Sequence, residues 1–79
     1  MKIPAIKLLV ESFTTAELQQ AEASLMNEQP LGIEVPGDDE GEQLTHILAA
    51  IEIQNHMASG MAFPQALRQY TQRVRTSIS

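Results

Sequence analysis

The sequence predicts an all-α domain of four short helices, with one short extended segment at about residues 31–35 before the central helix. Apolar residues recur at helical spacing in four stretches, and helix-start and helix-stop residues separate these stretches. Only residues 31–35 alternate as a strand would. No linker divides the 79 residues, so a single domain, residues 1–79, is expected.

The first predicted helix runs from Lys2 to Ser12. Pro4 suits its first turn, where a missing backbone N–H costs nothing. Its apolar residues follow the i, i+3, i+4, i+7 rhythm of an amphipathic helix: Ile3, Ile6, Leu9, Val10 and Phe13.

The second predicted helix runs from Thr15 to about Glu28 and ends before Pro30. Thr14 and Glu17 have the spacing of a capping box. The helix has a narrow apolar stripe and no basic residue. It therefore belongs on the surface, and a DNA-reading helix-turn-helix is disfavoured because nothing would meet the phosphates.

The extended segment alternates apolar with small or polar residues and ends at the turn residues Pro36-Gly37. No second strand is predicted to pair with it. Two placements remain open: the segment crosses the helices with water on its edge, or it pairs with its own copy in another subunit.

The central helix is predicted from Glu42 to Ala58, with Asp39 as its N-cap and Gly60 as its stop. At about 100° per residue, it has two apolar faces. One face, with Asn55 near its middle, comprises Leu44, Ile47, Leu48, Ile51 and Ala58; the other comprises Ala50, Ile53 and Met57. Two apolar faces imply two packing partners.

The last predicted helix begins at Pro64. Its apolar stripe is the most regular of the chain: Phe63, Leu67, Tyr70, Val74 and Ile78.

Composition limits the functions that are open to this chain. Leu, Ile, Val and Phe make up about a quarter of the residues, above the level typical of disorder. The net charge of −5 disfavours nucleic acid and anionic membranes as partners, and no stretch is a signal peptide or a membrane span. A cytoplasmic protein is expected. The absence of cysteine excludes disulfides and thiolate metal sites.

Two Glu-x3-His pairs are the only arrangement that suggests a site, Glu42 with His46 and Glu52 with His56. The two pairs point in different directions and lie about 15 Å apart along the helix, so one chain cannot gather them around a metal. No nucleophile motif or phosphate-binding glycine pattern is present. We therefore predict no catalytic residue, no metal and no cofactor.

The preferred function is a non-enzymatic module that associates with itself, with another protein as a further possible partner. A chain this small often needs association for stability. The predicted association face comprises His46, Ala50, Ile53, Met57, Leu31, Ile33 and Val35. The alternative is a small enzyme or ligand-binding protein whose site forms between subunits near His46 or His56.

The strings MKIPAIK, GDDEGEQLTHILAAI and YTQRVRTSIS resemble a family of short, uncharacterised bacterial proteins, a domain of unknown function. The similarity extends over almost the whole chain, and the middle string is its most specific part. The resemblance implies a complete small bacterial protein. The family has no assigned activity, so no functional residue is carried over from it.

Overall fold

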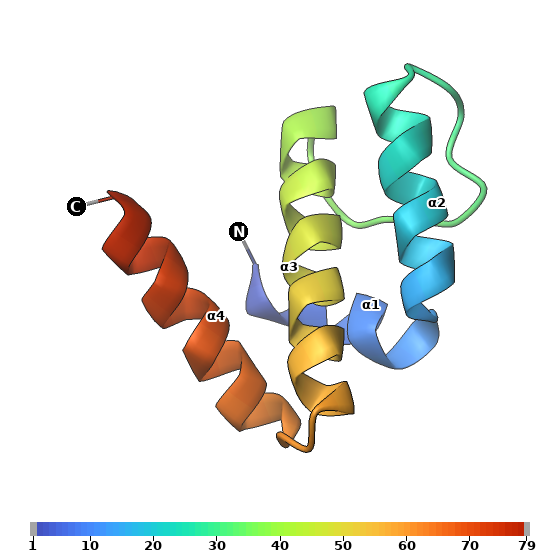
Figure 1. Ribbon diagram of the computed structural model, residues 1–79. Helices are drawn as coiled ribbons and strands as arrows, with labels where there is room; N and C mark the ends of the chain where they lie inside the picture. The colour runs from blue at the N-terminus through green and yellow to red at the C-terminus, as the bar shows by residue number, and fades with distance from the viewer. Residues whose placement is uncertain (1, 79) are drawn as a thin grey trace.

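The computed structural model describes residues 2–78 and the side chains of residues 2–75. Four helices form, as Figure 1 shows: α1 (Ile3–Ser12), α2 (Thr15–Met26), α3 (Glu40–Ala58) and α4 (Phe63–Ile78). No strand occurs in the described part of the chain. The predicted all-α fold with four helices is confirmed, and each predicted helix lies within a few residues of its observed bounds.

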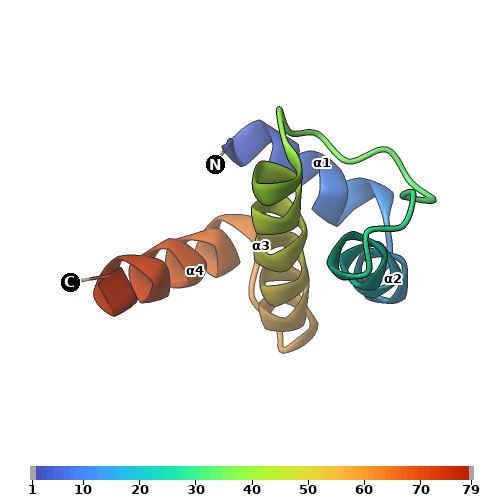
Figure 2. The ribbon, with the colours of Figure 1, turned by 90° about the horizontal axis from the view of Figure 1, so that it is seen from above.

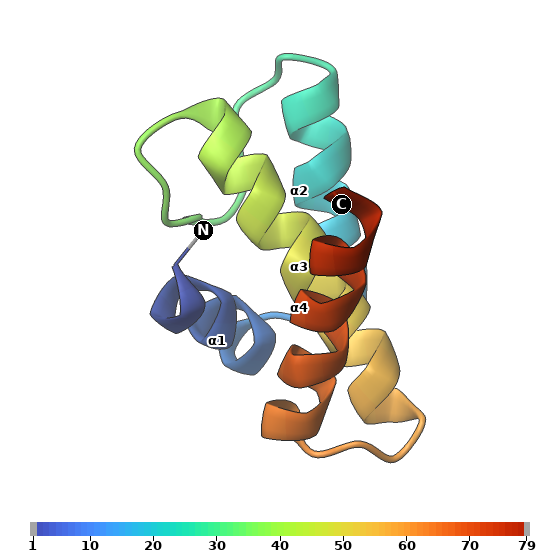
Figure 3. The same ribbon diagram turned by 90° about the vertical axis from the view of Figure 1, so that its left-hand side faces the viewer.

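Helix α3 is the element against which the rest of the chain packs. It makes extensive contacts with α1, α2 and α4, and these three contact one another far less. Seen from above, α1, α2 and α4 lie on three sides of α3, and no helix covers the fourth side (Figure 2). Helix α4 slants away from α3, so its C-terminal end lies apart from the other helices (Figures 1 and 2). Figure 3 views the molecule from the side of α4, which there lies in front of α3.

The predicted N-terminal caps form. The Thr14 hydroxyl accepts a hydrogen bond from the Glu17 backbone N–H, and the Glu17 carboxylate accepts one from the Thr14 N–H, which completes the capping box of α2. At α3, the Asp39 carboxylate accepts from the Glu42 N–H at 2.8 Å. Helix α3 therefore begins directly after Asp39, at Glu40, two residues before the predicted start.

Helices α2 and α3 end in the same hydrogen-bonding motif, which is built around Glu28 in α2 and around Gly60 in α3. At α3, Gly60 has a φ of +115°, and the Gly60 and Met61 N–H groups donate to the carbonyls of Met57 and His56. At α2 the same two hydrogen bonds form around Glu28, whose φ is +54°. The second helix therefore ends at Met26 through a left-handed glutamate, and Pro30 follows only after the helix has closed.

The extended segment crosses the helices instead of forming a strand. Val35 is buried, and Leu31 and Ile33 are half-buried against the core. The Gln43 side-chain amide donates to the Val35 carbonyl at 3.0 Å, which satisfies part of the segment's backbone. Of the two placements that the sequence leaves open, the described chain adopts the one across its own helices.

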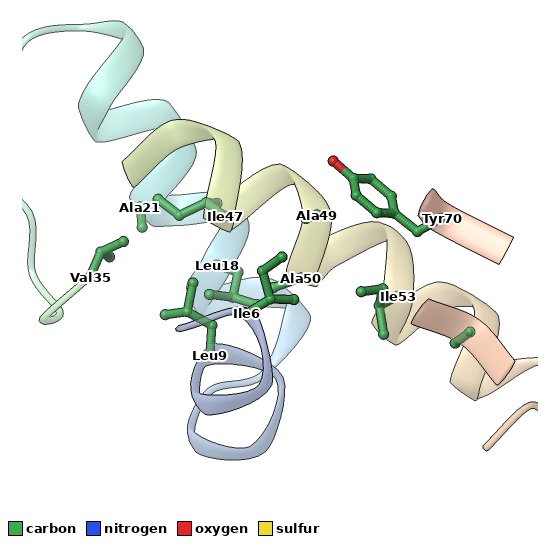
Figure 4. Packing of buried hydrophobic residues seen from close by; sticks show 11 residues of the cluster. Ile6, Leu9, Leu18, Ala21, Val35, Ile47, Ala49, Ala50, Ile53 and Tyr70 are labelled. Carbon is green, nitrogen blue, oxygen red and sulfur yellow. The ribbon is translucent and has the colours of Figure 1, made fainter. Parts of the chain in front are cut away.

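The core is a single cluster gathered on α3, drawn in Figure 4. Its buried members are Ile6, Leu9, Leu18, Ala21, Val35, Ile47, Ala49, Ala50, Ile53, Ala66 and Tyr70. On α4 the burial is offset from the predicted stripe. Ala66 and Tyr70 are buried, whereas Leu67 is only half-buried, because α4 packs against one helix alone. The side chain of Ile78 lies outside the described side chains.

The left-handed Glu28 predicts a simple gain in stability. Glycine has no Cβ to clash at positive φ, so Glu28→Gly should raise the free energy of unfolding by up to about 1 kcal/mol. Glu28→Gln, which removes the charge and keeps the Cβ, is the matched control and should gain less. Urea denaturation of both variants measures the difference. A Gly variant no more stable than the Gln variant would show that the backbone at residue 28 is not strained.

Candidate functional site

The predicted association face is filled largely by the chain itself. The side chains of His46, Ala50 and Ile53 are 0% exposed in the isolated chain. Met57 is half-buried, and the segment residues Leu31, Ile33 and Val35 pack on the same core. The apolar members of this face belong to the core cluster or pack against it. Helix α1 and the segment before α3 pack over the fully buried members, whereas Met57, Leu31 and Ile33 keep part of their surface exposed.

His46 joins three parts of the chain. Its Nε2 lies 3.0 Å from the Lys2 backbone N and its Nδ1 lies 2.8 Å from the Pro36 carbonyl oxygen. Because the Lys2 N–H can only donate, Nε2 must accept, and Nδ1 must carry the proton that it donates to Pro36. The ring is thus a neutral bridge from α3 to the N-terminus and to the preceding loop. Neither nitrogen is free to bind a metal or to exchange protons with a substrate.

Two further polar side chains of α3 act in the same way as His46. The Gln54 amide donates to the Phe13 carbonyl at 2.7 Å and its oxygen accepts from the Thr15 hydroxyl at 2.7 Å, so Gln54 bonds both sides of the turn between α1 and α2. Gln43 bonds the segment before α3. No buried side-chain nitrogen or oxygen lacks a partner in the described residues. The polar groups of α3 therefore satisfy the backbone of the connections around it.

The second Glu–His pair is part of a charged cluster that includes α4. Glu52 accepts two hydrogen bonds from the Arg73 guanidinium, through Nε and Nη2. His56 Nε2 lies 3.8 Å from the Glu52 carboxylate. The hydrogen bond to Glu52 raises the pKa of Arg73, and the nearby Glu52 charge adds to the effect. A carboxylate held by a bidentate arginine is already neutralised and is poorly placed to act as a general base.

Tyr70 lies beneath this ion pair. The Arg73 guanidinium carbon is 5.8 Å from the centroid of the Tyr70 ring, within the range of a cation–π contact. Burial raises the pKa of Tyr70, the Glu52 charge adds to this, and Arg73 opposes it. A phenol whose pKa is raised stays protonated near neutral pH and is not an activated acid or nucleophile. The cluster attaches α4 to α3 and offers no group prepared for catalysis.

No three His, Asp or Glu side chains converge on a common point in the described residues. The two Glu–His pairs stay separate: His46 lies in the core, with Glu42 at 3.9 Å, and His56 lies half-exposed beside Glu52. Among the same residues, none of the helices combines the length and the hydropathy that crossing a membrane requires.

The open surface of the molecule is the other apolar face of α3. Leu48 is 43% exposed, Leu44 and Ile51 are half-exposed, and Asn55 and Ala58 are exposed. Seen from above, one side of α3 has no helix over it (Figure 2), in agreement with the exposure of these residues. A shallow hollow between α3 and α4 runs along this side and is lined by Leu48, Ile51, Glu52, Asn55, Tyr70 and Arg73.

The sequence thus shows two apolar faces on α3, and the structure determines which one stays open. Ala50 and Ile53 of one face are fully buried. On the other face Ile47 is also fully buried and Ile51 packs against the core, whereas Leu48 is 43% exposed. Helical periodicity could not make this choice, because it depends on where α1 and the 31–37 segment lie. The sequence does distinguish Arg73 from the other arginines of the last helix, because Arg68 and Arg75 share one side of that helix and Arg73 lies on another.

Comparisons with known proteins give one match. The model of a family of unknown function, DUF6952, matches residues 1–79. No curated protein and no solved structure matches the chain.

The bridge at His46 predicts a large effect of substitution. His46→Leu keeps similar volume but leaves the Lys2 N–H and the Pro36 carbonyl without their partner, so unfolding should become easier by about 2–3 kcal/mol. His56→Leu is the control, because that ring is half-exposed and bonds no backbone group in the described residues. Its effect should stay within about 0.5 kcal/mol. Chemical denaturation of both variants tests this, and equal losses would contradict the bridging role of His46.

Proposed function

The chain belongs to DUF6952, a family of unknown function, and we propose that it acts as a non-enzymatic protein-interaction module whose first partner is a second copy of itself. The surface that we assign to this contact is the open side of α3, defined by Leu44, Leu48, Ile51, Asn55 and Ala58. We prefer this surface to the association face expected from the sequence, because His46, Ala50 and Ile53 of that face are fully buried within the chain.

The observation that carries the proposal is the exposure of apolar side chains on the central helix. A surface helix normally buries its apolar stripe and leaves its polar face to water. Helix α3 buries one stripe fully. On the second stripe Ile47 is buried, but Leu48 is 43% exposed and Leu44 and Ile51 are partly exposed. Contiguous exposed apolar surface on a small protein is typical of a contact site.

The size of the domain supports the same proposal. A single core in a chain of 79 residues is marginal, and small domains are commonly stabilised by disulfides, metals or association. The chain has no cysteine. Covering the open side of α3 would turn a helix with one solvated apolar face into a fully packed one.

The state of the two histidines weighs against the alternative of an enzyme or ligand site between subunits. Both nitrogens of His46 are bonded within the chain. Glu52, the acidic neighbour of His56, is already bound by Arg73. Interaction through an apolar surface needs neither residue to be released.

The test is a pair of matched substitutions. Leu48 and Leu8 are both exposed, at 43% and 51%, but Leu8 lies on α1 and away from the open side of α3. Leu48→Glu should weaken association by about tenfold or more, because it places a charge in an apolar contact, whereas Leu8→Glu should leave it unchanged. Light scattering over a concentration series measures the mass of parent and variants.

The parent is expected above 8.7 kDa at micromolar concentration, with a mass that rises with concentration towards that of a dimer. A parent that stays at 8.7 kDa at every concentration would overturn the proposal. An equal loss of association in the two variants would move the contact away from α3.

A further inference from the structure

The open side of α3 has the spacing of a coiled-coil seam. Leu44, Leu48, Ile51, Asn55 and Ala58 follow one another at alternating steps of four and three residues. This is the repeat of the two core positions of a heptad, with Leu48 and Asn55 at one position and Leu44, Ile51 and Ala58 at the other. A seam of this kind fits the same seam on another helix, so the natural occupant is a second copy of the chain.

We propose that the second copy docks with its α3 parallel to this one, and that the Asn55 side chains of the two copies hydrogen-bond to each other across the two-fold axis. This inference rests on the proposed self-association and specifies its geometry. Asn55 then determines the orientation and the register of the pair.

The side-chain amide of Asn55 favours the parallel orientation. It lies exposed in the seam and makes no side-chain hydrogen bond within the described residues. In a parallel pair the two amides face each other, and each can donate to the other. In an antiparallel pair with the same seam, Asn55 would face Leu44 of the second copy and would lose its bonds to water without replacement. A single asparagine at one core position of a seam specifies register and oligomer state, and here the same need for a partner amide favours the parallel orientation.

The charges on the two helices that border the seam favour the same orientation. Helix α2 carries Glu17 and Glu22 and no basic residue, and α4 carries Arg68, Arg73 and Arg75 and no acidic residue. The two helices lie on opposite sides of α3 (Figure 2). In a parallel pair the two-fold axis runs along α3, so α4 of each copy faces α2 of the other. An antiparallel pair would place α4 against α4, with like charges facing.

A stable contact between two copies needs more area than the seam of α3 alone can supply. A specific interface buries roughly 800 Å² per partner, which is about a sixth of the 5105 Å² surface of this chain. The seam of one 19-residue helix is too narrow to supply that alone. Helices α2 and α4 must therefore contribute to the contact between the copies, so their charges influence whether the parallel or the antiparallel pair forms.

Cysteine cross-linking distinguishes the two orientations, because the chain has no cysteine of its own. Leu48→Cys, Ile51→Cys and the exposed control Leu8→Cys are made separately, so that Asn55 stays in place in each variant. The two seam variants are mixed under mild oxidation, and the disulfide-linked species are identified by intact mass. A disulfide forms only where the two Cα atoms come within about 7 Å.

The parallel pair predicts that each seam variant links to itself, with homodisulfides exceeding mixed disulfides by about tenfold or more. Leu8→Cys should not link. A predominance of mixed Leu48–Ile51 disulfides would overturn the parallel orientation while leaving self-association intact. A chain that is dimeric by light scattering but links at no seam position would overturn it as well. A chain that is monomeric throughout would refute the proposed function itself.

The role of Asn55 has a separate readout. Asn55→Leu removes the amide and keeps the seam apolar, so association should persist or tighten while the orientation becomes mixed. In that background, mixed disulfides between Leu48→Cys and Ile51→Cys should increase, since these positions meet only in the antiparallel pair. An unchanged disulfide pattern would show that Asn55 does not set the orientation.

Discussion

One helix, α3, carries the packing of the whole chain, and every other element is positioned by its contact with it. Helices α1, α2 and α4 contact α3 far more than they contact one another. The hydrophobic cluster draws four buried residues from one stretch of α3, Ile47, Ala49, Ala50 and Ile53, and the buried His46 lies in the same stretch. Three helices do not enclose a fourth on all sides. One side of α3 is therefore left without a helix over it (Figure 2).

Polar side chains of α3 complete the arrangement that the apolar ones begin. His46, Gln43 and Gln54 each bond backbone groups of a connection that would otherwise be held by apolar contacts alone. Arg73 and Glu52 do the same for α4 through their side chains. These groups are committed to holding the fold. These polar groups hold the fold together, and the apolar seam is the surface to which we assign the proposed self-association.

The sequence predicts the local features well, because their causes lie within a few residues. The capping pairs at Thr14 and Asp39 and the stop at Gly60 depend on backbone groups of the same turn. The two apolar faces of α3 also follow from periodicity. Which face is covered does not, because that depends on contacts such as His46 with Lys2, which are 44 residues apart. The left-handed backbone at Glu28 could not be predicted, because the residue at that position is not a glycine.

The central claim is that a second copy covers the open side of α3. The most direct measurement is an isotope-filtered NOE experiment on a mixture of methyl-labelled and unlabelled protein, which detects contacts only between copies. The account predicts intermolecular contacts at the methyl groups of Leu44, Leu48 and Ile51. Contacts confined to the exposed methyl groups of Ile3 and Leu8 on α1, or no intermolecular contacts at millimolar concentration, would contradict it.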